Sequence, residues 1–465
     1  MITRGIHLFF PDLKKEEIRK FGLLAITGFC VIGAYWLMRL LKNTIFYKVA
    51  FPVELGWADH QGALFQPVAK FWSPFIVLGV VLIYSKLVDL FKKHQLFYII
   101  CSFYGVLFAS IAGVVFIKEY YGSQALGKEL LALTGWVHYF SVETFGSLLP
   151  ALFWSFTNSI STTESAKRGF PLIVACMQIG AIGGSALLLF TESVGAMWPF
   201  LVLPAIFMPV IVGMIYYFML TTPADELVGN KAAAASEKKK EGFFEGFTSG
   251  LVLLVSRPYL FGVLIISTFY EVCMQIVDYQ MHAQAARTSD YSSAVAFSKF
   301  EGIFGVSSNL LSFFIALLGT SYIIKRFGVR ISLAIYPVIF AATIGGLLLY
   351  FYSSPTAYQL LWATFGAFMV VKALSYAINN PLKEMMYIPT SKDAKFKSKG
   401  WTDMFGGRFS KAAGGQINNF FKHDLGELMV YGTFFSFGLI GIWLGAAFYV
   451  GRKNQQLIQD GKIIE

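Results

Sequence analysis

The sequence predicts an all-α integral membrane protein with about twelve transmembrane helices, arranged as two six-helix halves. Of its 465 residues, 56% are hydrophobic and only 14% are charged, whereas soluble domains carry about 25% charged residues. The apolar residues form runs as long as a spanning helix, which needs about 20 residues. A soluble domain is excluded, because each charged side chain at the centre of a bilayer costs about 2.5–3.5 kcal/mol.

Twelve apolar runs are long enough to be spanning helices. The fourth and the eleventh are the weakest candidates, and the eleventh contains GGRFSKAAGGQINNFF at residues 406–421. A segment this polar cannot face lipid, so it must line the bundle interior or a water-filled cavity. The eleventh run is therefore informative about function. The predicted spans are 21–41, 67–91, 95–117, 140–161, 169–191, 197–220, 255–280, 294–324, 330–352, 356–380, 401–421 and 427–450.

Lysine and arginine residues concentrate in the loops on one side of the predicted spans. An even number of spans places both termini on that same side. Cytoplasmic loops carry an excess of Lys and Arg, which predicts cytoplasmic termini and a multi-pass protein of the inner (cytoplasmic) membrane. Topology is thus the first explanation of the net charge of +11, and no nucleic-acid partner is expected. The few cations on the other side include Lys48, Lys118, Lys128, Arg287 and Lys422.

The longest polar break separates two sets of six runs. It reads TTPADELVGNKAAAASEKKKEG at 221–242, and we predict a cytoplasmic linker over 221–254 between halves 1–220 and 255–465. Two such halves related by an axis along the membrane normal form the major-facilitator architecture. The fifth run contains IGAIGGSAL and the eleventh contains SKAAGGQIN at an equivalent place. Small residues at these places predict close helix packing.

Charged and polar side chains inside the first half mark a candidate site. Arg39 and Lys42 lie one turn apart at the non-cytoplasmic end of the first span, where they share one face of the helix. Both could contact an anion, or could extend to the membrane interface instead. Glu143 opens the predicted fourth span, where an acidic residue could also complement the helix dipole. Asn158 ends that span and could cap it or line a cavity.

The second half contains the deeper charges. Glu271 lies well inside the seventh span, which predicts a cavity or a cationic partner for it. The tenth span and its cytoplasmic end are marked by Lys372, Asn380 and Lys383, and charge rules alone would explain Lys383 by topology. Arg408 and Lys411 lie one turn apart in the polar eleventh span. Two cations on one face suggest an anionic substrate, and Arg and Lys both suit phosphate.

Motifs for an enzyme are missing from the sequence. It contains no P-loop, no HExxH motif and no dinucleotide fingerprint after a predicted strand, which argues against an ATP-hydrolysing pump. The four cysteines lie inside apolar runs without paired spacing, so no disulfide or metal site is expected. We expect no cofactor. The six histidines are scattered through the tail, loops and helix ends: His7, His60, His94, His138, His282 and His423.

Four stretches of the chain resemble the ATP/ADP antiporter family, the nucleotide transporters of plastids and obligate intracellular bacteria. The resemblance covers most of the chain and implies a major-facilitator-like fold that moves nucleotides by exchange or with protons. The family's charged transport residues map onto Lys42, Glu143, Glu271 and either Lys383 or Lys411. The matching stretches are FPDLKKEEIRKFGLL with WLMRLLKNTIFY, VETFGSLLPALFWSFTNSISTTESAKRGFPL, FYEVCMQIVDYQ, and INNPLKEMMYIPTSKDAKFKSKGWTDMFGGRFSKAAGGQI.

Three positions depart from the family pattern. Asn43 stands where the family has Asp, Ser159 where it has Glu after the Asn equivalent to Asn158, and Gln275 where it has Lys. The departures leave open whether the substrate is ATP and ADP, another nucleotide, NAD, or another phosphorylated or carboxylated metabolite.

The sequence thus leads to a first hypothesis and two alternatives. The first is a nucleotide transporter, working by ATP/ADP-type exchange or proton-driven uptake through alternating access, and acting as a monomer in the lipid bilayer. The second is a major-facilitator carrier of another anionic metabolite, coupled to protons through Glu271 or Glu143. A membrane enzyme or structural subunit is the third, and the scattered histidines argue against it.

Overall fold

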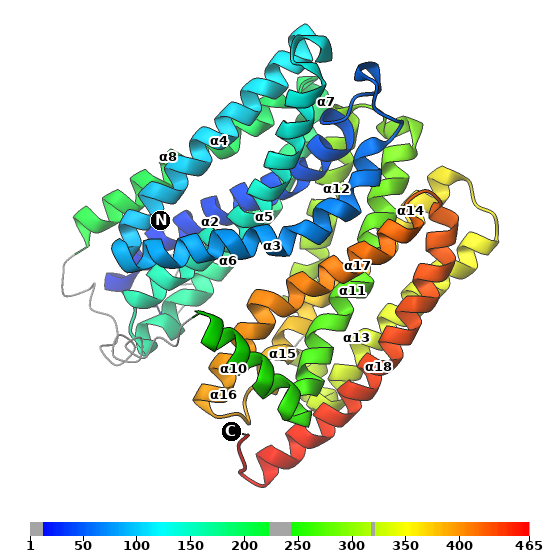
Figure 1. Ribbon diagram of the computed structural model, residues 1–465. Coiled ribbons are helices and arrows are strands. Elements are labelled where there is room, and N and C mark those ends of the chain that lie inside the picture. Colours follow the sequence, from blue (N-terminus) through cyan, green and yellow to red (C-terminus); the bar gives the residue numbers. More distant parts are fainter. Residues whose placement is uncertain (1–12, 223–242, 318–320, 465) are drawn as a thin grey trace. The chain divides into compact units, whose positions relative to one another are not determined.

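The computed structural model describes residues 13–222, 243–317 and 321–464, and its regular structure in these ranges is helical apart from one bridge between Thr390 and Ile464. The all-α prediction is confirmed (Figure 1). The long helices are α2 (Lys15–Thr44), α3 (Gln61–Leu90), α4 (Lys93–Tyr121), α5 (Gly127–Ser159), α6 (Thr163–Leu187), α8 (Trp198–Thr221), α10 (Phe243–Ser256), α11 (Pro258–Arg287), α12 (Ala294–Ile315), α13 (Ser321–Tyr352), α14 (Ala357–Leu374), α17 (Gly407–Phe421) and α18 (Leu425–Gln459).

Short helices complete the chain. The π-helical turns η1 (Ile45–Val49), η7 (Ser375–Asn379) and η8 (Thr402–Gly406) continue longer helices without a loop. The remaining short helices are α7 (Thr191–Val194), α15 (Asn380–Met386), α16 (Lys392–Trp401), and the 3-10 turns η2 (Val53–Leu55), η3 (Ser123–Ala125), η4 (Leu188–Phe190) and η5 (Ser289–Tyr291).

Within the described ranges, nine helical segments are long and apolar enough to cross a membrane. They coincide with nine of the twelve predicted spans. The fourth, eighth and eleventh predicted spans are also helical, in α5, α12 and α17, but these helices fall short of the same criteria of length and apolar composition. A multi-pass membrane protein is therefore established, whereas the count of twelve crossings stays a prediction.

One difference between the predicted and observed helix boundaries changes the interpretation of a candidate site residue. Helix α5 begins at Gly127, well before the predicted start at 140, so Glu143 lies mid-helix and cannot serve the helix start. The eighth predicted span, 294–324, covers α12 up to Ile315, a π-helical turn at 316–317 and, after three residues that the structure does not describe, the first residues of the helix that begins at Ser321. Gly328 interrupts α13 with a φ of 70°, a left-handed conformation that suits glycine. The helix that was predicted to start at 330 therefore starts directly after this break.

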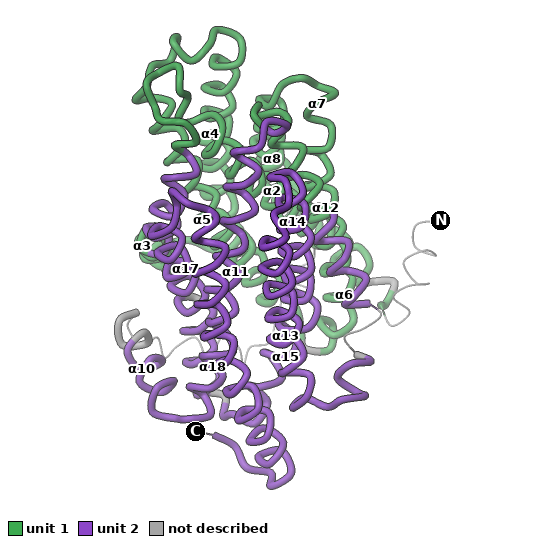
Figure 2. Tube along the Cα trace, turned by 90° about the vertical axis from the view of Figure 1, so that its right-hand side faces the viewer, with its two compact units in different colours: residues 1–61, 75–240, 292–306 green, residues 62–74, 241–291, 307–465 purple. Residues whose placement is uncertain are grey.

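The described chain forms two compact units, coloured separately in Figure 2. Unit 1 contains residues 1–61, 75–240 and 292–306, and unit 2 contains 62–74, 241–291 and 307–465. Each unit thus takes a short segment from the opposite half of the sequence: the start of α12 belongs to unit 1 and the start of α3 to unit 2. Most of the predicted linker, 223–242, lies outside the described residues, and its last part forms α10. The linear domain boundaries remain a prediction.

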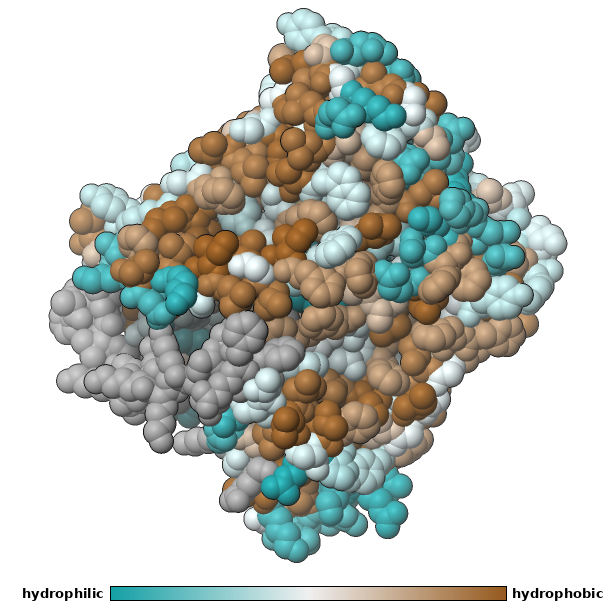
Figure 3. All heavy atoms as spheres, in the orientation of Figure 1, coloured by the Kyte–Doolittle hydropathy of each residue, from teal (hydrophilic) through white to brown (hydrophobic). Residues whose placement is uncertain are grey.

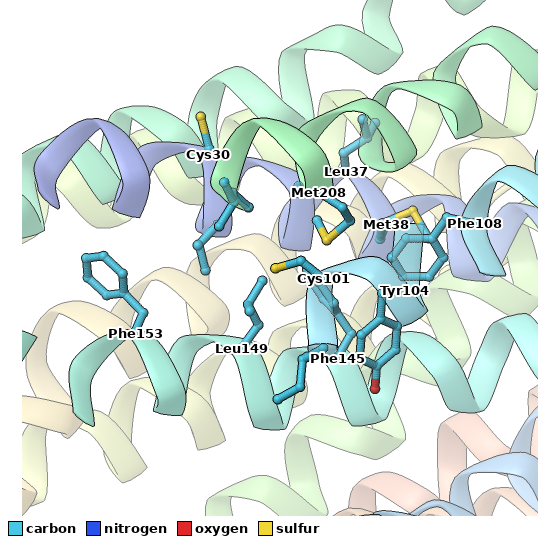
Figure 4. Packing of buried hydrophobic residues seen from close by; sticks show 14 of the residues in the cluster. Cys30, Leu37, Met38, Cys101, Tyr104, Phe108, Phe145, Leu149, Phe153 and Met208 are labelled. Atoms are coloured by element: carbon cyan, nitrogen blue, oxygen red, sulfur yellow. The ribbon is translucent and has the colours of Figure 1, made fainter. Parts of the chain in front are cut away.

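Unit 1 has an apolar core between α2, α4, α5 and α8, and Figure 4 shows Leu37, Cys101, Phe145 and Met208 packed there. Helix α6 contacts α2 most closely. A Cβ atom added at Gly184 would lie 2.2 Å from the Gly33 carbonyl oxygen, closer than any real contact. The small-residue motif of the fifth span therefore permits the close helix packing that was predicted, because only glycine allows this approach.

Unit 2 repeats this contact with equivalent helices. A Cβ atom added at Gly414 on α17 would lie 2.8 Å from the carbonyl oxygen of Val272 on α11. The pair α11 and α17 thus corresponds to the pair α2 and α6, which supports the internal repeat that the two glycine motifs indicated. On the surface, Figure 3 shows apolar side chains along the middle of the outer helices of unit 1 and hydrophilic ones near their ends, as a membrane-spanning surface requires.

Candidate substrate-binding site

Unit 1 holds a buried ion pair between the two residues that the sequence singled out in its first half. The Lys42 ammonium donates to a carboxylate oxygen of Glu143 at 2.6 Å. The two side chains are only 8% and 20% exposed. The ammonium also lies 4.5 Å from the centre of the Tyr139 ring, one helical turn before Glu143. Removal of two charges from water is costly. The short contact between the two charges and the neighbouring aromatic ring offset this cost.

The residue after Lys42 has a partner of its own within unit 1. The Asn43 amide donates to a carboxylate oxygen of Glu301 at 3.2 Å. Glu301 lies at the start of α12 and is fully buried. Beside this contact, the hydroxyl groups of Ser298 and Thr44 lie 3.1 Å apart. Asn43, which stands where the family pattern has Asp, therefore places an amide and not a second carboxylate beside the buried Glu301.

Unit 2 holds the second ion pair, and this one is looser. The Lys411 ammonium lies 3.5 Å from a carboxylate oxygen of Glu271, and their side chains are 42% and 15% exposed. The Tyr270 hydroxyl donates to the other carboxylate oxygen at 2.8 Å. The Glu271 carboxylate thus has one contact at each of its two oxygens, and its lysine partner is the more exposed member of the ion pair.

More than one lysine acts on Glu271. Besides Lys411, the ammonium groups of Lys383 and Lys372 attract its carboxylate electrostatically. Lys383 also lies 5.3 Å from the centre of the Tyr270 ring. The structure therefore brings Lys383 together with Glu271 and Lys411, so loop topology alone does not account for this lysine. Lys372 was not among the selected site residues, although a lysine in mid-span was a signal that could have found it.

The other predicted residues lie apart from these contacts or at their margins. Asn158 is exposed near the end of α5, fifteen positions and thus about 22 Å along the helix from Glu143. Arg39 is half-buried, and its guanidinium lies 4.9 Å from the centre of the Trp36 ring. Asn380 begins α15 and Arg408 lies near the start of α17, both half-buried.

The π-helical turns η1, η7 and η8 adjoin charged site residues. The turn η1 follows Lys42 and Asn43, η7 lies between Lys372 and Lys383, and η8 precedes Arg408 and Lys411. A π-turn carries an additional residue in the helix and often occurs at functional sites. These turns change the direction of the side chains that follow them, which periodicity in the sequence could not reveal.

Solved structures with similar folds are transporters. The chain aligns with a nucleoside transporter, NupG, at 14% identity and a TM-score of 0.58, over 92% of this chain and 98% of that chain. A peptide transporter, POT, in complex with sulfate aligns at 13% identity and a TM-score of 0.62, over 93% and 95%. These matches define the class: the described helices have the fold of major-facilitator-type membrane transporters.

Sequence relatives define the family. A model of the TLC ATP/ADP transporter family matches residues 3–450, so the chain belongs to this family of nucleotide transporters. The chloroplastic ADP,ATP carrier protein 2 of Arabidopsis thaliana is 25% identical over 92% of this chain and 74% of its own. ADP,ATP carrier protein 1 of Chlamydia pneumoniae is 23% identical over 97% and 96%. The resemblance seen in the sequence is confirmed, and because the relatives are carriers, the chain is a transporter rather than an enzyme.

Proposed function

We propose that this transporter carries ATP and ADP, or a closely related nucleotide, across the membrane by alternating access. Two lysine–glutamate pairs carry the proposal, one in each unit: Lys42 with Glu143 and Lys411 with Glu271. Ionisable groups inside spanning helices are expensive, and they mark the path of a substrate or a coupling ion. Relatives named ADP,ATP carriers support a nucleotide as that substrate.

The chemistry of the pairs suits a phosphorylated solute. A phosphate oxygen competes with a carboxylate for the same lysine, because both are anionic acceptors of a charge-assisted hydrogen bond. In the absence of substrate the glutamate neutralises the lysine. When a phosphate arrives it replaces the glutamate, and the released carboxylate then turns to other donors, such as the Tyr270 hydroxyl beside Glu271.

The same proposal includes the setting of the carrier. It is a monomer in the inner (cytoplasmic) membrane, with both termini cytoplasmic and lipid around its apolar helices. The loop lysines and arginines support this orientation, since cytoplasmic loops carry most such residues. A reporter domain fused at the C-terminus, active only in the cytoplasm, tests the orientation, and an inactive reporter would reverse it.

Uptake of labelled nucleotides into vesicles tests the function. Purified protein in proteoliposomes is given ATP, ADP, GTP or NAD, with and without nucleotide inside. We expect saturable uptake that Lys42→Ala and Lys411→Ala abolish, while Lys453→Ala at the exposed end of α18 retains it. Uptake that needs internal nucleotide indicates exchange, whereas uptake into empty vesicles that a protonophore abolishes indicates proton coupling. Absence of uptake and binding for every nucleotide would reject the proposal.

A related anionic metabolite is the second candidate, favoured by the contacts at two departures from the family pattern. Asn43 is bonded to Glu301, and the Gln275 amide lies 3.4 Å from a carboxylate oxygen of Asp278. The charges around each pair therefore differ from those that the family pattern predicts. Uptake of a labelled nucleotide is measured in the presence of an excess of unlabelled phosphorylated or carboxylated metabolites. The metabolite that inhibits this uptake most strongly distinguishes the two candidates.

A further inference from the structure

Lys372 is a buried cation in the middle of a spanning helix. It belongs to the apolar segment Ala357–Met386 and is only 6% exposed. Two aromatic rings flank its ammonium group, Phe368 at 5.3 Å and Tyr376 at 5.9 Å from the ring centres. Such contacts offset part of the cost of burial, and the rest calls for an anion. The ammonium acts on Glu271, which Lys411 also contacts.

Tyr376 differs from its neighbours in the π-turn. The other residues of η7 are buried, whereas Tyr376 is 38% exposed. Its ring is one of the two that flank the Lys372 ammonium, at 5.9 Å from the ring centre. The partly exposed ring thus lies beside a buried cation, whereas a tyrosine that only faces lipid would have no charged neighbour.

We propose that Lys372 is a third phosphate-binding lysine beside Lys411 and Lys383, and that the Tyr376 ring stacks on the nucleobase. This inference rests on the proposed function and deepens it, because it assigns the two ends of a nucleotide to two residues four positions apart. Nucleobases stack on exposed aromatic side chains whatever their sequence, since every base has a π face. Lysine supplies a point charge that suits the mobile oxygens of a phosphate chain.

Binding of three probes to the full-length protein in nanodiscs tests this assignment. ATP carries base and phosphates, tripolyphosphate carries only phosphates, and adenosine carries only the base. For Lys372→Met, the dissociation constants of ATP and tripolyphosphate are expected to rise about tenfold or more. For Tyr376→Leu, the ATP constant is expected to rise about tenfold, with tripolyphosphate binding unchanged. Tyr376→Phe keeps the ring and is expected to bind ATP like the wild type.

Matched controls separate binding from folding. Tyr358→Leu removes an exposed tyrosine at the start of α14, and Lys453→Met removes an exposed lysine of α18. Neither is expected to change any constant. Lys372→Arg keeps the charge, so it is expected to bind tripolyphosphate better than Lys372→Met; thermal unfolding of each variant reports whether it is folded.

Two results overturn the inference. Tripolyphosphate binding that is unchanged in a folded Lys372→Met variant removes the third lysine from the site. Equal loss of ATP and tripolyphosphate binding in Tyr376→Leu removes the stacking role. If the wild type binds none of the three probes and transports no nucleotide, the proposed function fails instead, and these variants are then uninformative about the base.

Discussion

The two units hold the same kind of ion pair in two different states. In unit 1 the nitrogen of Lys42 and the oxygen of Glu143 are 2.6 Å apart and both side chains are largely buried. In unit 2 the corresponding distance between Lys411 and Glu271 is 3.5 Å, and the lysine side chain is 42% exposed. A short buried pair holds helices together, because either charge alone would be costly there. A long pair with an open lysine can exchange its partner.

The comparison also concerns the number of cations. One lysine faces Glu143 in the closest contact of unit 1, whereas three lysines act on Glu271 in unit 2. Three lysines therefore act on the carboxylate of the looser pair. We therefore expect unit 2 to take the phosphate chain first and the unit 1 pair to secure the fold, and variants at the two pairs can be compared directly.

The largest effect is expected from Glu143→Gln. It leaves the Lys42 ammonium buried without its carboxylate, which destabilises a protein by about 3–5 kcal/mol, so both the stability and the transport of this variant should be lost. Unfolding in denaturant measures the loss of stability, and Glu129→Gln at the exposed first turn of α5 is the control. The double variant Lys42→Glu with Glu143→Lys should recover part of the stability. A stable Glu143→Gln variant would contradict the structural role of the pair.

Lys411→Met is expected to separate transport from stability. Its side chain is 42% exposed and its ion pair is long, so its loss should change the free energy of unfolding by about 1 kcal/mol or less. Transport should nevertheless fall at least tenfold, since a phosphate ligand is removed. Parallel measurements of unfolding and uptake check this. Equal destabilisation by Lys411→Met and Glu143→Gln would abolish the distinction between the two units.

A smaller effect is expected from Asn43→Asp, which restores the residue of the family pattern. The new carboxylate would face the buried carboxylate of Glu301, now 3.2 Å from the Asn43 amide. Like charges at this distance repel, so transport should fall severalfold and recover when Glu301→Gln is added. Uptake by the single and double variants measures the coupling. Full activity of the single variant would show that Glu301 tolerates a second acid.

The smallest effect is expected at the exposed ion pair of unit 1, where Lys299 contacts Glu192. Their side chains are 39% and 47% exposed, and exposed pairs contribute about 0–1 kcal/mol. The free energy of unfolding of Lys299→Ala should therefore differ from that of the wild type by no more than this amount, and its transport activity should be normal. A large loss of uptake would indicate that exposure is a poor guide to function in unit 1, which would weaken the comparison.

The sequence predicted the helical class and most spans, and it singled out the four charged residues that form the two ion pairs, because these features depend on composition and on the high cost of charge in lipid. Lys42, Glu143, Glu271 and Lys411 were each conspicuous as ionisable groups inside apolar runs. The glycine motifs of the fifth and eleventh spans likewise predicted the close contacts that Gly184 and Gly414 make. Patterns set by one helix and its solvent can be found in a single sequence.

Pairings across distant segments could not be found in this way. Which lysine meets which glutamate depends on tertiary contacts, and so does the bond of Asn43 with Glu301, 258 positions away. Helix α5 begins before its apolar stretch, so Glu143 was assigned to a helix start when it lies mid-helix. The π-turns shift side-chain direction, and hydropathy carries no signal of them. Lys372 was seen but not selected, because its aromatic neighbours were unknown.

The division of the chain between the units has a consequence for its synthesis. Unit 1 needs residues 292–306, which are made only after 241–291 of unit 2. When the first six helices have been synthesised, unit 1 is therefore still incomplete. Its helix α2 then lacks Glu301 on α12, the residue to which Asn43 donates. The hydrogen bond between Asn43 and Glu301 can therefore form only after α12 has been synthesised.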